Sequence, residues 1–300
     1  MAKKIQLLFL AVVLTVTGVC AQTIESLRND IEQIVRSKNA IVGVAISGAN
    51  GDDTLSSNGT EHFPMQSVFK FPIALAMLSE IDKGRFSLDQ KIDIKKNELL
   101  PGLWSPIREK YPDGVTLTIA EIIEYTVALS DNVGCDVLLK LLGKPQKVET
   151  YLLKNGFNDI SIKINEETMQ SNWDLQFQNW TTPLEANRIL QVFYENKDNQ
   201  LSQKSYDFVW ETMKTTQTGK NKLKGQLPEG TIVAHKTGWS GQNKSTGITA
   251  ASNDIGIVFL PDGSYFVISI FITASKEDEE TNEKIIADIT KAAWEYFIKK

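Results

Sequence analysis

Ser67 and Lys70 lie three residues apart, in the segment Ser67-Val68-Phe69-Lys70. On a helix this spacing places a hydroxyl and an amine on the same face, within reach of proton transfer. A serine alone is a poor nucleophile, but a neighbouring lysine can act as its base when burial or a nearby positive charge lowers the lysine pKa. Pro72 predicts that the helix begins within a few residues of Ser67, because proline is tolerated only near a helix start. Free N–H groups at this positive helix end would then stabilise an oxyanion.

The pair alone is a weak signal, because a chain of 300 residues contains about one serine and lysine at this spacing by chance. The tripeptides Ser130-Asp131-Asn132 and Lys236-Thr237-Gly238 are rarer. The first lies between two predicted helices, where the alternative is that Asp131 or Asn132 merely caps the second helix. The second ends a predicted strand, where a glycine lets a substrate lie against the backbone. A solvated lysine at a strand end is the alternative there.

Together, in this order, the three motifs resemble the signature set of penicillin-binding proteins and class A β-lactamases, and the resemblance covers nearly the whole mature chain. What distinguishes the hydrolases is a glutamate of the Ω loop that serves as the base of the second step. The resemblance assigns this role to Glu166, with Gln170 supplying the amide that holds the water. Glu167 as the base, and a merely solvated acidic loop, are the alternatives.

The resemblance implies an acyl-enzyme mechanism that needs no metal and no organic cofactor. Either Lys70, or Glu166 through a water, removes the proton of Ser67, and the family leaves this choice open. The N–H groups of Ser67 and Trp239 would hold the oxyanion, and Ser130 would relay a proton to the departing ring nitrogen. The residues expected to bind the substrate are Trp104, Asn132, Gln170, Lys222, Lys236, Thr237, Gly238 and Trp239.

Several segments resemble the VEB and PER branch of extended-spectrum enzymes, namely His62-Phe63-Pro64-Met65-Gln66, Leu103-Trp104-Ser105-Pro106 and Gln178-Asn179-Trp180. Asp136 also fits this branch, since most of the family has asparagine there. That asparagine donates to the Ω-loop backbone, and an ionised carboxylate has no proton to give. We therefore expect a rearranged loop and a roomier pocket. Ile164 agrees, because the family's usual arginine of the loop salt bridge is not at that position.

Lys222 and Trp239 depart from the pattern of the branch. The branch commonly has arginine at the position of Lys222, and a lysine keeps the charge but loses the two-pronged geometry. Trp239 replaces a small or β-branched residue, so its indole would either crowd or extend the pocket wall. We interpret His62 and His235 as structural, because neither has acidic or cysteine partners at metal-ligand spacing. Cys135 is expected to be a small buried residue.

The two ends of the chain carry most of the strand signals. Helical apolar spacing over 23–38 predicts a first helix, and another helix is expected after the last strand. The turn Pro261-Asp262-Gly263-Ser264 predicts a hairpin. We expect an α/β fold in which an antiparallel sheet is flanked by the N- and C-terminal helices, in three αβα layers, beside an all-helical domain. The predicted strands are 41–46, 231–235, 247–251, 254–260 and 265–273.

The central part of the chain has mostly helical patterns. Thr118 begins a capping box, Thr182 precedes a proline at a helix start, and Gly143 is placed to end a helix. The predicted boundaries are 22–62 and 220–300 for the α/β domain, 63–219 for the all-helical domain, and about 160–181 for the Ω loop.

The composition is that of a soluble globular protein, with 42% hydrophobic and 23% charged residues. Lys3 and Lys4 precede an apolar run over 5–19, which predicts a signal peptide over residues 1–21 and a periplasmic protein of a Gram-negative bacterium. Lipidation at Cys20 is the alternative, disfavoured by the bulky Val19. After cleavage behind residue 21 a single cysteine is left, so no intramolecular disulfide can form.

The net charge of −5, without a prominent basic cluster, argues against nucleic acid as a partner. A monomer that acts on a small β-lactam is expected. Two other classes are weighed against the hydrolase. A cell-wall DD-peptidase shares the first three motifs but lacks the Ω-loop base. A non-enzymatic β-lactam sensor is disfavoured by the cleavable signal and by the lack of a later membrane anchor.

Overall fold

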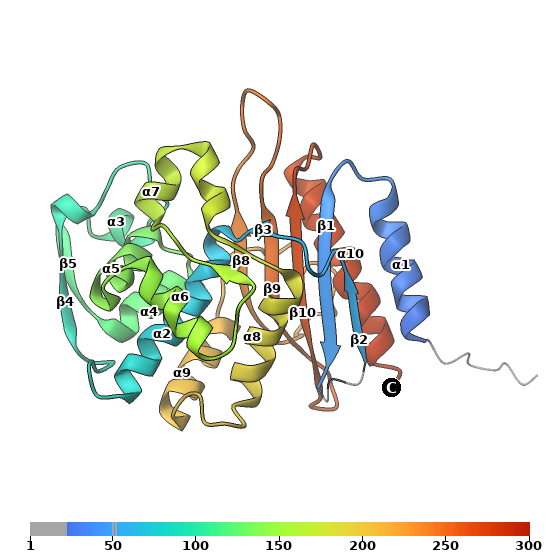
Figure 1. Ribbon diagram of the computed structural model, residues 1–300, viewed down its shortest axis with the longest axis horizontal. Coiled ribbons are helices and arrows are strands. Elements are labelled where there is room, and N and C mark those ends of the chain that lie inside the picture. Colours follow the sequence, from blue (N-terminus) through green and yellow to red (C-terminus); the bar gives the residue numbers. More distant parts are fainter. Residues whose placement is uncertain (1–22, 50, 52) are drawn as a thin grey trace, which may run out of the picture.

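The computed structural model describes residues 23–49, 51 and 53–300. The predicted signal peptide and the alternative lipid anchor at Cys20 lie outside the described residues. At the centre of the molecule is an antiparallel sheet in the order β2-β1-β10-β9-β8 (Figure 1). Its strands are β1 (Ile41–Gly48), β2 (Thr54–Ser57), β8 (Val233–Trp239), β9 (Ser252–Phe259) and β10 (Tyr265–Thr273). The sheet therefore joins both ends of the chain, as predicted.

Four of the five predicted strands are confirmed with small shifts of their ends, and the strand predicted at 247–251 is wrong. This segment belongs to the loop between β8 and β9. Gly247 has a φ of +68°, which takes the backbone out of the extended region. The side chain of Asn243 accepts hydrogen bonds from the N–H groups of Ser245 and Thr246, so the chain turns there. Within 247–251, Thr249 forms isolated bridges with Gln242 and Ser275, which do not extend into a strand.

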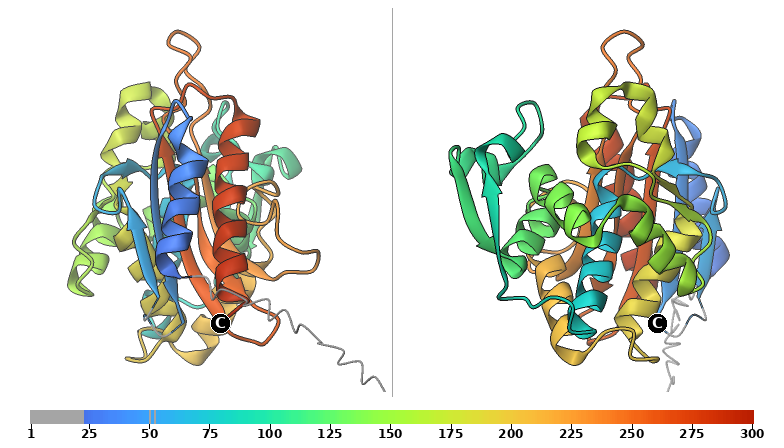
Figure 2. Two further views of the ribbon diagram at one scale, coloured as in Figure 1. Left: turned by 90° about the vertical axis from the view of Figure 1, so that its right-hand side faces the viewer. Right: turned by 60° about the vertical axis from the view of Figure 1, so that its left-hand side comes forward.

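The first and last helices cover one face of the sheet, where they lie side by side (Figure 2). These are α1 (Ile24–Arg36) and α10 (Glu279–Phe297), capped by the side chains of Thr23 and Asp278. Because β1, β9 and β10 are buried along nearly their whole length, both faces of the sheet must be covered. The buried side chains of the two helices include Leu27, Ile31, Ile285, Ile286, Ile289 and Trp294.

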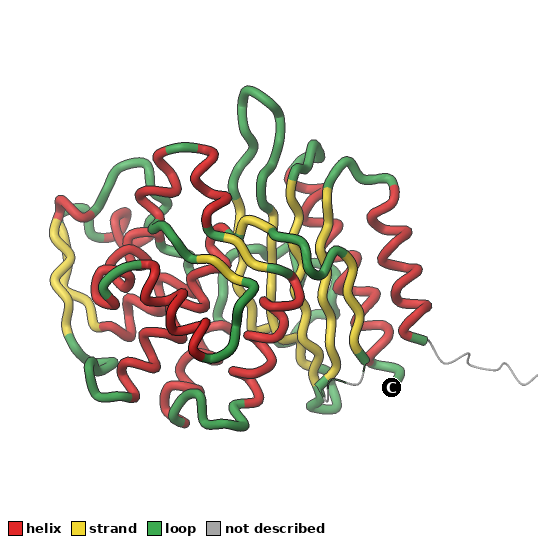
Figure 3. Tube along the Cα trace, in the orientation of Figure 1, coloured by secondary structure: helices red, strands yellow, loops and turns green. Residues whose placement is uncertain are grey.

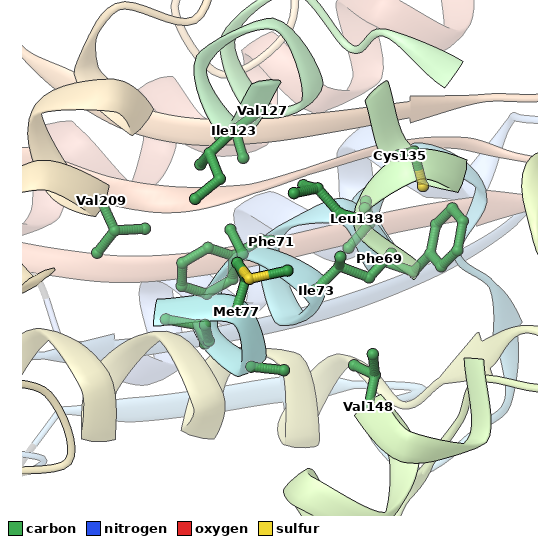
Figure 4. Packing of buried hydrophobic residues seen from close by; sticks show 14 of the residues in the cluster. Phe69, Phe71, Ile73, Met77, Ile123, Val127, Cys135, Leu138, Val148 and Val209 are labelled. Atoms are coloured by element: carbon green, nitrogen blue, oxygen red, sulfur yellow. The ribbon is translucent and has the colours of Figure 1, made fainter. Parts of the chain in front are cut away.

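The other face packs against the larger hydrophobic cluster, which includes residues of the helical part of the molecule. Figure 3 shows these helices in red beside the strands in yellow. The centre of the cluster is α2 (Lys70–Asp82), whose residues 70–79 are all buried. A helix that is apolar on all sides has no solvent face and must lie inside the core. Figure 4 shows Phe71, Ile73 and Met77 of this helix surrounded by side chains of neighbouring elements. This packing fixes the start of α2 relative to the sheet.

The segment 63–219 is mostly helical, but the expected all-helical domain needs a correction because it also contains short strands. In Lys91–Lys95 charged residues alternate with isoleucines, and this period-two pattern is typical of a half-buried strand. The strands are β3 (Phe63–Pro64), β4 (Lys91–Lys95), β5 (Gly114–Thr118), β6 (Ile160–Ser161) and β7 (Trp180–Thr181). The helices are α3 (Pro106–Lys110), α4 (Ile119–Ala128), α5 (Asn132–Leu142), α6 (Pro145–Lys154), α7 (Glu166–Ser171), α8 (Pro183–Glu195) and α9 (Gln203–Lys214), with 3₁₀ turns η1 (Gln66–Phe69), η2 (Lys96–Glu98) and η3 (Trp173–Gln178).

The predicted helix ends in this segment are confirmed. Thr118 forms the capping box of α4 with Glu121, and Thr182 caps α8, which begins with Pro183. Gly143 ends α5 with a φ of +108°, in the left-handed region that favours glycine. Within the part of the chain that the structure describes, no helix combines the length and apolar character needed to cross a membrane.

Candidate active site

Ser67 lies in the 3₁₀ turn η1, which leads directly into α2. The prediction that a helix starts near Ser67 is confirmed, and Pro72 falls in the first turn of α2, where its missing N–H costs nothing. Lys70 is the first residue of α2 and is completely buried, whereas Ser67 is partly exposed. The Nζ atom of Lys70 lies 2.9 Å from Oγ of Ser67. The hydroxyl and the amine are therefore in direct hydrogen-bonding contact.

The Lys70 ammonium also joins two other predicted site motifs. Its Nζ lies 2.9 Å from Oε1 of Glu166, 2.5 Å from Oδ1 of Asn132 and 2.8 Å from the Ser130 carbonyl. Glu166 is as deeply buried as Lys70, so the two charges form an ion pair shielded from water. A lysine acts as a base only after it has lost a proton, and the Glu166 carboxylate is placed to receive that proton.

The tripeptide Ser130-Asp131-Asn132 occupies the break between α4 and α5, as predicted. Asp131 caps α5 by accepting from the N–H of Gly134 at 2.8 Å, and it also accepts from the N–H of Ile107 at 2.7 Å. Capping and a site role therefore coexist in this motif. Asp131 fixes the backbone, while Ser130 and Asn132 line the pocket. Ser130 has a φ of +58°, an uncommon conformation for a residue with a side chain.

Lys236 brings the third motif to the same place. Its Nζ donates to Oγ of Ser130 at 3.0 Å and to the carbonyl of Thr237 at 3.0 Å. Burial lowers the pKa of Lys236 well below its usual range, and the positive charge of Lys70 lowers it further. A chain of close contacts thus runs from Ser67 through Lys70 and Ser130 to Lys236.

The reason for Gly238 differs from the one expected. A Cβ atom at this position would lie 2.4 Å from the carbonyl oxygen of Met65 and 3.2 Å from Cβ of Gln66. The glycine thus lets β8 pass close to the segment that precedes Ser67. It also lines the pocket, but the close backbone approach that it permits is made by the chain itself.

Glu166 and Glu167 differ sharply in their surroundings. Glu166 is buried and contacts Lys70, whereas Glu167 is exposed. Asp136 holds this turn of the Ω loop by accepting from the N–H of Glu166 at 2.8 Å, the N–H of Glu167 at 3.0 Å and the side-chain amide of Asn165 at 3.0 Å. The loop therefore presents donors to Asp136, as a carboxylate requires. Burial raises the pKa of Asp136 to about 7 despite these hydrogen bonds.

Asn179 closes the neck of the Ω loop where the usual charged pair is absent. Its Oδ1 accepts from the N–H groups of Lys163 and Ile164 at 2.8 and 3.1 Å, and its Nδ2 donates to the Ile164 carbonyl at 2.9 Å. Gln66 adds a second tie, since its amide donates to Gln176 of η3 at 2.7 Å. Neither role was predicted from the sequence, where Ile164 indicated only a rearranged loop.

A cavity of about 430 Å³ opens over Ser67. Trp104 and Trp239 border it with 56% and 50% of their surface exposed, so Trp239 extends the wall of the pocket and does not fill it. Lys222 is buried, with Nζ 3.4 Å from the carbonyls of Gly238 and Asn253, and burial lowers its pKa. Further lining residues are Asn132, Glu166, Gln170, Thr218, Thr237, Glu279 and Glu283.

Comparison with known proteins shows the family of this chain. A family model described as "Beta-lactamase enzyme family" matches residues 26–297. The chain is 54% identical to beta-lactamase VEB-1 of Pseudomonas aeruginosa over 99% of both chains. It is 40% identical to the extended-spectrum beta-lactamase PER-1 of the same species, over 91% of this chain and 88% of the relative. The chain belongs to the β-lactamase family.

A solved structure gives the same result for the fold. The crystal structure of the TLA-1 extended-spectrum β-lactamase superposes with a TM-score of 0.89 at 48% identity, covering 92% of this chain and 99% of that one. The antiparallel sheet with its flanking helices is thus the fold of a class A β-lactamase.

The histidines and the cysteine of this β-lactamase lie outside the reaction centre. His62 stacks on Trp180 with ring centroids 3.5 Å apart. Cys135 is completely buried, and burial raises the pKa of its thiol. His235 is buried and contacts Asp254 on the neighbouring strand through its Nδ1 at 3.0 Å, which agrees with a structural role. This acidic partner lies 19 residues away in the sequence, at no recognisable ligand spacing.

Proposed function

We propose that this β-lactamase hydrolyses the lactam ring of penicillins and cephalosporins, with the extended spectrum that the names of PER-1 and TLA-1 state for those relatives. The reaction would protect its host from these antibiotics. The observation that carries the proposal is the position of the Lys70 ammonium, within 2.9 Å of both Ser67 Oγ and the Glu166 carboxylate. The nucleophile Ser67 and the bases proposed for the two steps, Lys70 and Glu166, are therefore linked by direct contacts.

The first step is acylation of Ser67. Lys70 passes its proton to Glu166, accepts the proton of Ser67, and Oγ then attacks the lactam carbonyl. In the second route Glu166 takes the proton through a water, and the same network serves both routes. The N–H groups of Ser67 and Trp239 stabilise the oxyanion that forms. The lactam C–N bond breaks as the new ester forms.

The departing ring nitrogen needs a proton, and Ser130 supplies it. Ser130 Oγ lies 3.0 Å from Nζ of Lys236 and 3.5 Å from Nζ of Lys70, so either ammonium can replenish the proton. Because burial favours the neutral form of Lys236, its proton is given up more readily than that of an exposed lysine.

The other lining residues hold the substrate. Lys222, Lys236 and Thr237 bind its carboxylate: Lys222 and Thr237 line the cavity, and Nζ of the buried Lys236 lies 3.0 Å from Oγ of Ser130, which also lines it. Asn132 contacts the acylamide side chain, Gly238 contributes backbone on the same side, and Trp104 and Trp239 cover the mouth.

Hydrolysis of the ester completes the cycle. Glu166 first returns its proton through Lys70, replacing the one that Ser130 gave to the ring nitrogen, and is again a carboxylate. It then takes a proton from a water held by Gln170 as that water attacks the ester carbonyl, and this proton passes to Ser67 Oγ as the ester bond breaks. Glu166 is favoured over Glu167 as the base because it is buried against Lys70. No metal and no organic cofactor takes part in the proposed cycle.

Turnover of nitrocefin by the purified protein tests the function directly. A hydrolase gives many equivalents of product per enzyme, whereas a DD-peptidase or a β-lactam sensor is acylated once and then stops. The expected result is sustained turnover. A single stoichiometric burst would refute hydrolysis and favour one of the other two classes.

We further propose that the protein is secreted to the periplasm as a monomer after removal of residues 1–21. The functional units are the α/β domain over 22–62 and 220–300 and the helical domain over 63–219, with the Ω loop at about 160–181. Mass spectrometry of the mature N-terminus separates cleavage after Ala21 from lipidation at Cys20. A diacylglycerol adduct on the cysteine would contradict the soluble form.

A further inference from the structure

Trp239 is the last residue of β8, which forms the edge of the central sheet. Side chains alternate between the two faces along a strand, so Trp239 shares its face with Thr237. Lys236 and Gly238 lie on the other face, where they meet the helical domain. Oγ1 of Thr237 lies 2.6 Å from Oγ1 of Thr218, in the loop that follows α9. The indole of Trp239 therefore lies on the side of this loop.

The loop that follows α9 and the start of α10 complete this end of the cavity. A Cβ atom at Gly219 would lie 2.5 Å from Cγ2 of Thr237, so the glycine lets the loop pack directly against β8. Further along the loop, Asn221 donates to Glu283 of α10 at 3.0 Å. In Figure 2 the first turn of α10 and the loop that follows β8 lie at the same end of the sheet. Glu279 and Glu283 are one helical turn apart, and both line the cavity.

Lys222 places the carboxylate of a bound substrate next to Trp239. Its Nζ lies 3.4 Å from the carbonyl of Gly238, which belongs to the peptide bond that joins this glycine to Trp239. In a cephalosporin the carbon that bears the carboxylate is bonded directly to C3, the carbon that bears a variable substituent. A carboxylate held by Lys222 therefore places the C3 substituent beside the side chain of Trp239.

The side chains at this end of the cavity suit a flat cation. The indole of Trp239 is 50% exposed and forms no hydrogen bond or ring contact among the described residues. Trp104, by contrast, donates from its Nε1 to the Leu129 carbonyl at 3.1 Å. Within the part of the chain that the structure describes, neither Glu279 nor Glu283 forms an ion pair within 4.0 Å. An aromatic face binds a quaternary nitrogen, and nearby carboxylates without a cationic partner favour it further.

We propose that Trp239 is a specificity-determining residue for cephalosporins whose C3 substituent carries a flat cation, such as a pyridinium. The indole is the platform on which the cationic ring lies, and Glu279 and Glu283 supply the negative charge. The substrate carboxylate neutralises Lys222, so the cation is not repelled from this end of the cavity. The inference rests on the proposed function, because it assigns the cavity to β-lactam substrates.

Cephaloridine and cephalothin are matched probes for this proposal. They share the same nucleus and the same thienylacetamido side chain, but the methylene on C3 carries a pyridinium in cephaloridine and an acetoxy group in cephalothin. The ratio of their kcat/KM values, cephaloridine over cephalothin, measures how well the enzyme discriminates between the two substituents. A general effect of a substitution on the proposed oxyanion hole cancels in this ratio.

Trp239→Leu removes the aromatic face and keeps an apolar side chain. The ratio should fall about fivefold or more from its wild-type value, because the pyridinium loses its platform. Trp104→Leu is the matched control. It makes the same change on the helical side of the cavity, where the Trp104 carbonyl accepts from the N–H of Asn132 at 3.0 Å, and it should change both rates by the same factor. If Trp239→Leu does not fold, Trp239→Thr carries the same prediction.

The Glu279→Gln, Glu283→Gln double variant tests the contribution of charge. The ratio should fall about twofold or more at low ionic strength, since water and salt partly screen carboxylates at the rim of a cavity. Glu280→Gln is the control, because it removes a charge from the same turn of α10 at a residue that does not line the cavity. This variant should keep the wild-type ratio.

A wild-type ratio in folded Trp239→Leu or in the folded double variant would overturn the inference. So would a ratio that falls by the same factor in the matching control. In each of these cases, sustained hydrolysis of cephalothin by the wild-type enzyme would leave the proposed function intact. A wild-type enzyme that turns over neither the two cephalosporins nor nitrocefin would overturn the proposed function and this inference together.

Discussion

The two sides of the pocket differ in how their charges are balanced. Around Ser67 the Lys70 ammonium has a carboxylate partner, Glu166, at 2.9 Å. On the other side Lys222 and Lys236 are buried without a carboxylate in contact, among the residues that the structure describes. A buried charge is costly unless it is paired. On the proposed function, the reaction centre already holds its counter-charge in the free protein, whereas the binding side gains one only when an anionic substrate binds.

Ser67→Ala is expected to have the largest effect, because it removes the nucleophile from the side of the pocket where Lys70 is paired with Glu166. The rate of nitrocefin hydrolysis should fall by about 10⁴-fold or more, as for nucleophile deletions in other acyl-transfer enzymes. Circular dichroism should show an unchanged fold, since Ser67 is partly exposed. Retention of a tenth of the wild-type rate would remove Ser67 from the mechanism.

Glu166→Gln breaks the ion pair but leaves the nucleophile in place. We expect kcat to fall by about 10²–10⁴-fold, because the general base of deacylation is lost. Glu167→Gln is the matched control, since this neighbour is exposed, and it should keep a rate close to wild type. The opposite pattern, with Glu167→Gln impaired and Glu166→Gln active, would show that Glu167 is the base.

Lys222→Ala tests the side of the pocket where the buried lysines have no carboxylate in contact, among the described residues. Loss of one charged contact to the substrate carboxylate should lower kcat/KM by about 10–100-fold, mainly through KM. Lys222→Arg keeps the charge and presents its donors in a planar, two-pronged arrangement, so it should retain most of the affinity. Steady-state kinetics on benzylpenicillin measures both. Equal losses in the two variants would mean that the charge of Lys222 is not what the substrate recognises.

Asp136→Asn is expected to act on stability, because Asp136 holds the turn of the Ω loop that carries Glu166. Because burial raises the pKa of Asp136 to about 7, the folded protein holds a proton there that the unfolded chain releases near pH 4. This contribution is complete below pH 4 and is lost as the pH rises through about 7. The variant should lack this pH dependence, and its amide should cost about 1–3 kcal/mol by facing the N–H groups of Glu166 and Glu167.

Urea unfolding at several pH values between 4 and 8 measures this effect. The difference in unfolding free energy between wild type and Asp136→Asn should change across that interval. A constant difference would show that Asp136 has the same charge in both states of the protein.

The sequence predicted the catalytic motifs better than their supports. Ser67, Lys70, Ser130 and Lys236 carry short patterns whose order is itself informative, and the structure brings them together. Capping signals such as Thr118 were equally local and are confirmed. Local patterns of this kind depend only on neighbouring residues, so a single sequence contains all that is needed to detect them.

The supports depend on contacts between distant segments, which a single sequence does not show. Asp254 meets His235 only because β9 pairs with β8. Gly238 is needed because the Met65 carbonyl, from a distant part of the chain, lies against it. The strand prediction at 247–251 was wrong, because its apolar and β-branched residues lie in a loop that turns at Gly247. Their residue types alone are those of a strand.

The most direct test of the central claim is the mass spectrum of the Glu166→Gln protein after incubation with benzylpenicillin. The claim is that Ser67 forms an ester and that Glu166 is needed to break it. The account predicts a stable adduct of one benzylpenicillin per chain, located by peptide mapping on Ser67 and absent in the Ser67→Ala, Glu166→Gln double variant. An adduct on any other residue, or no adduct in a folded protein that binds the drug, would contradict it.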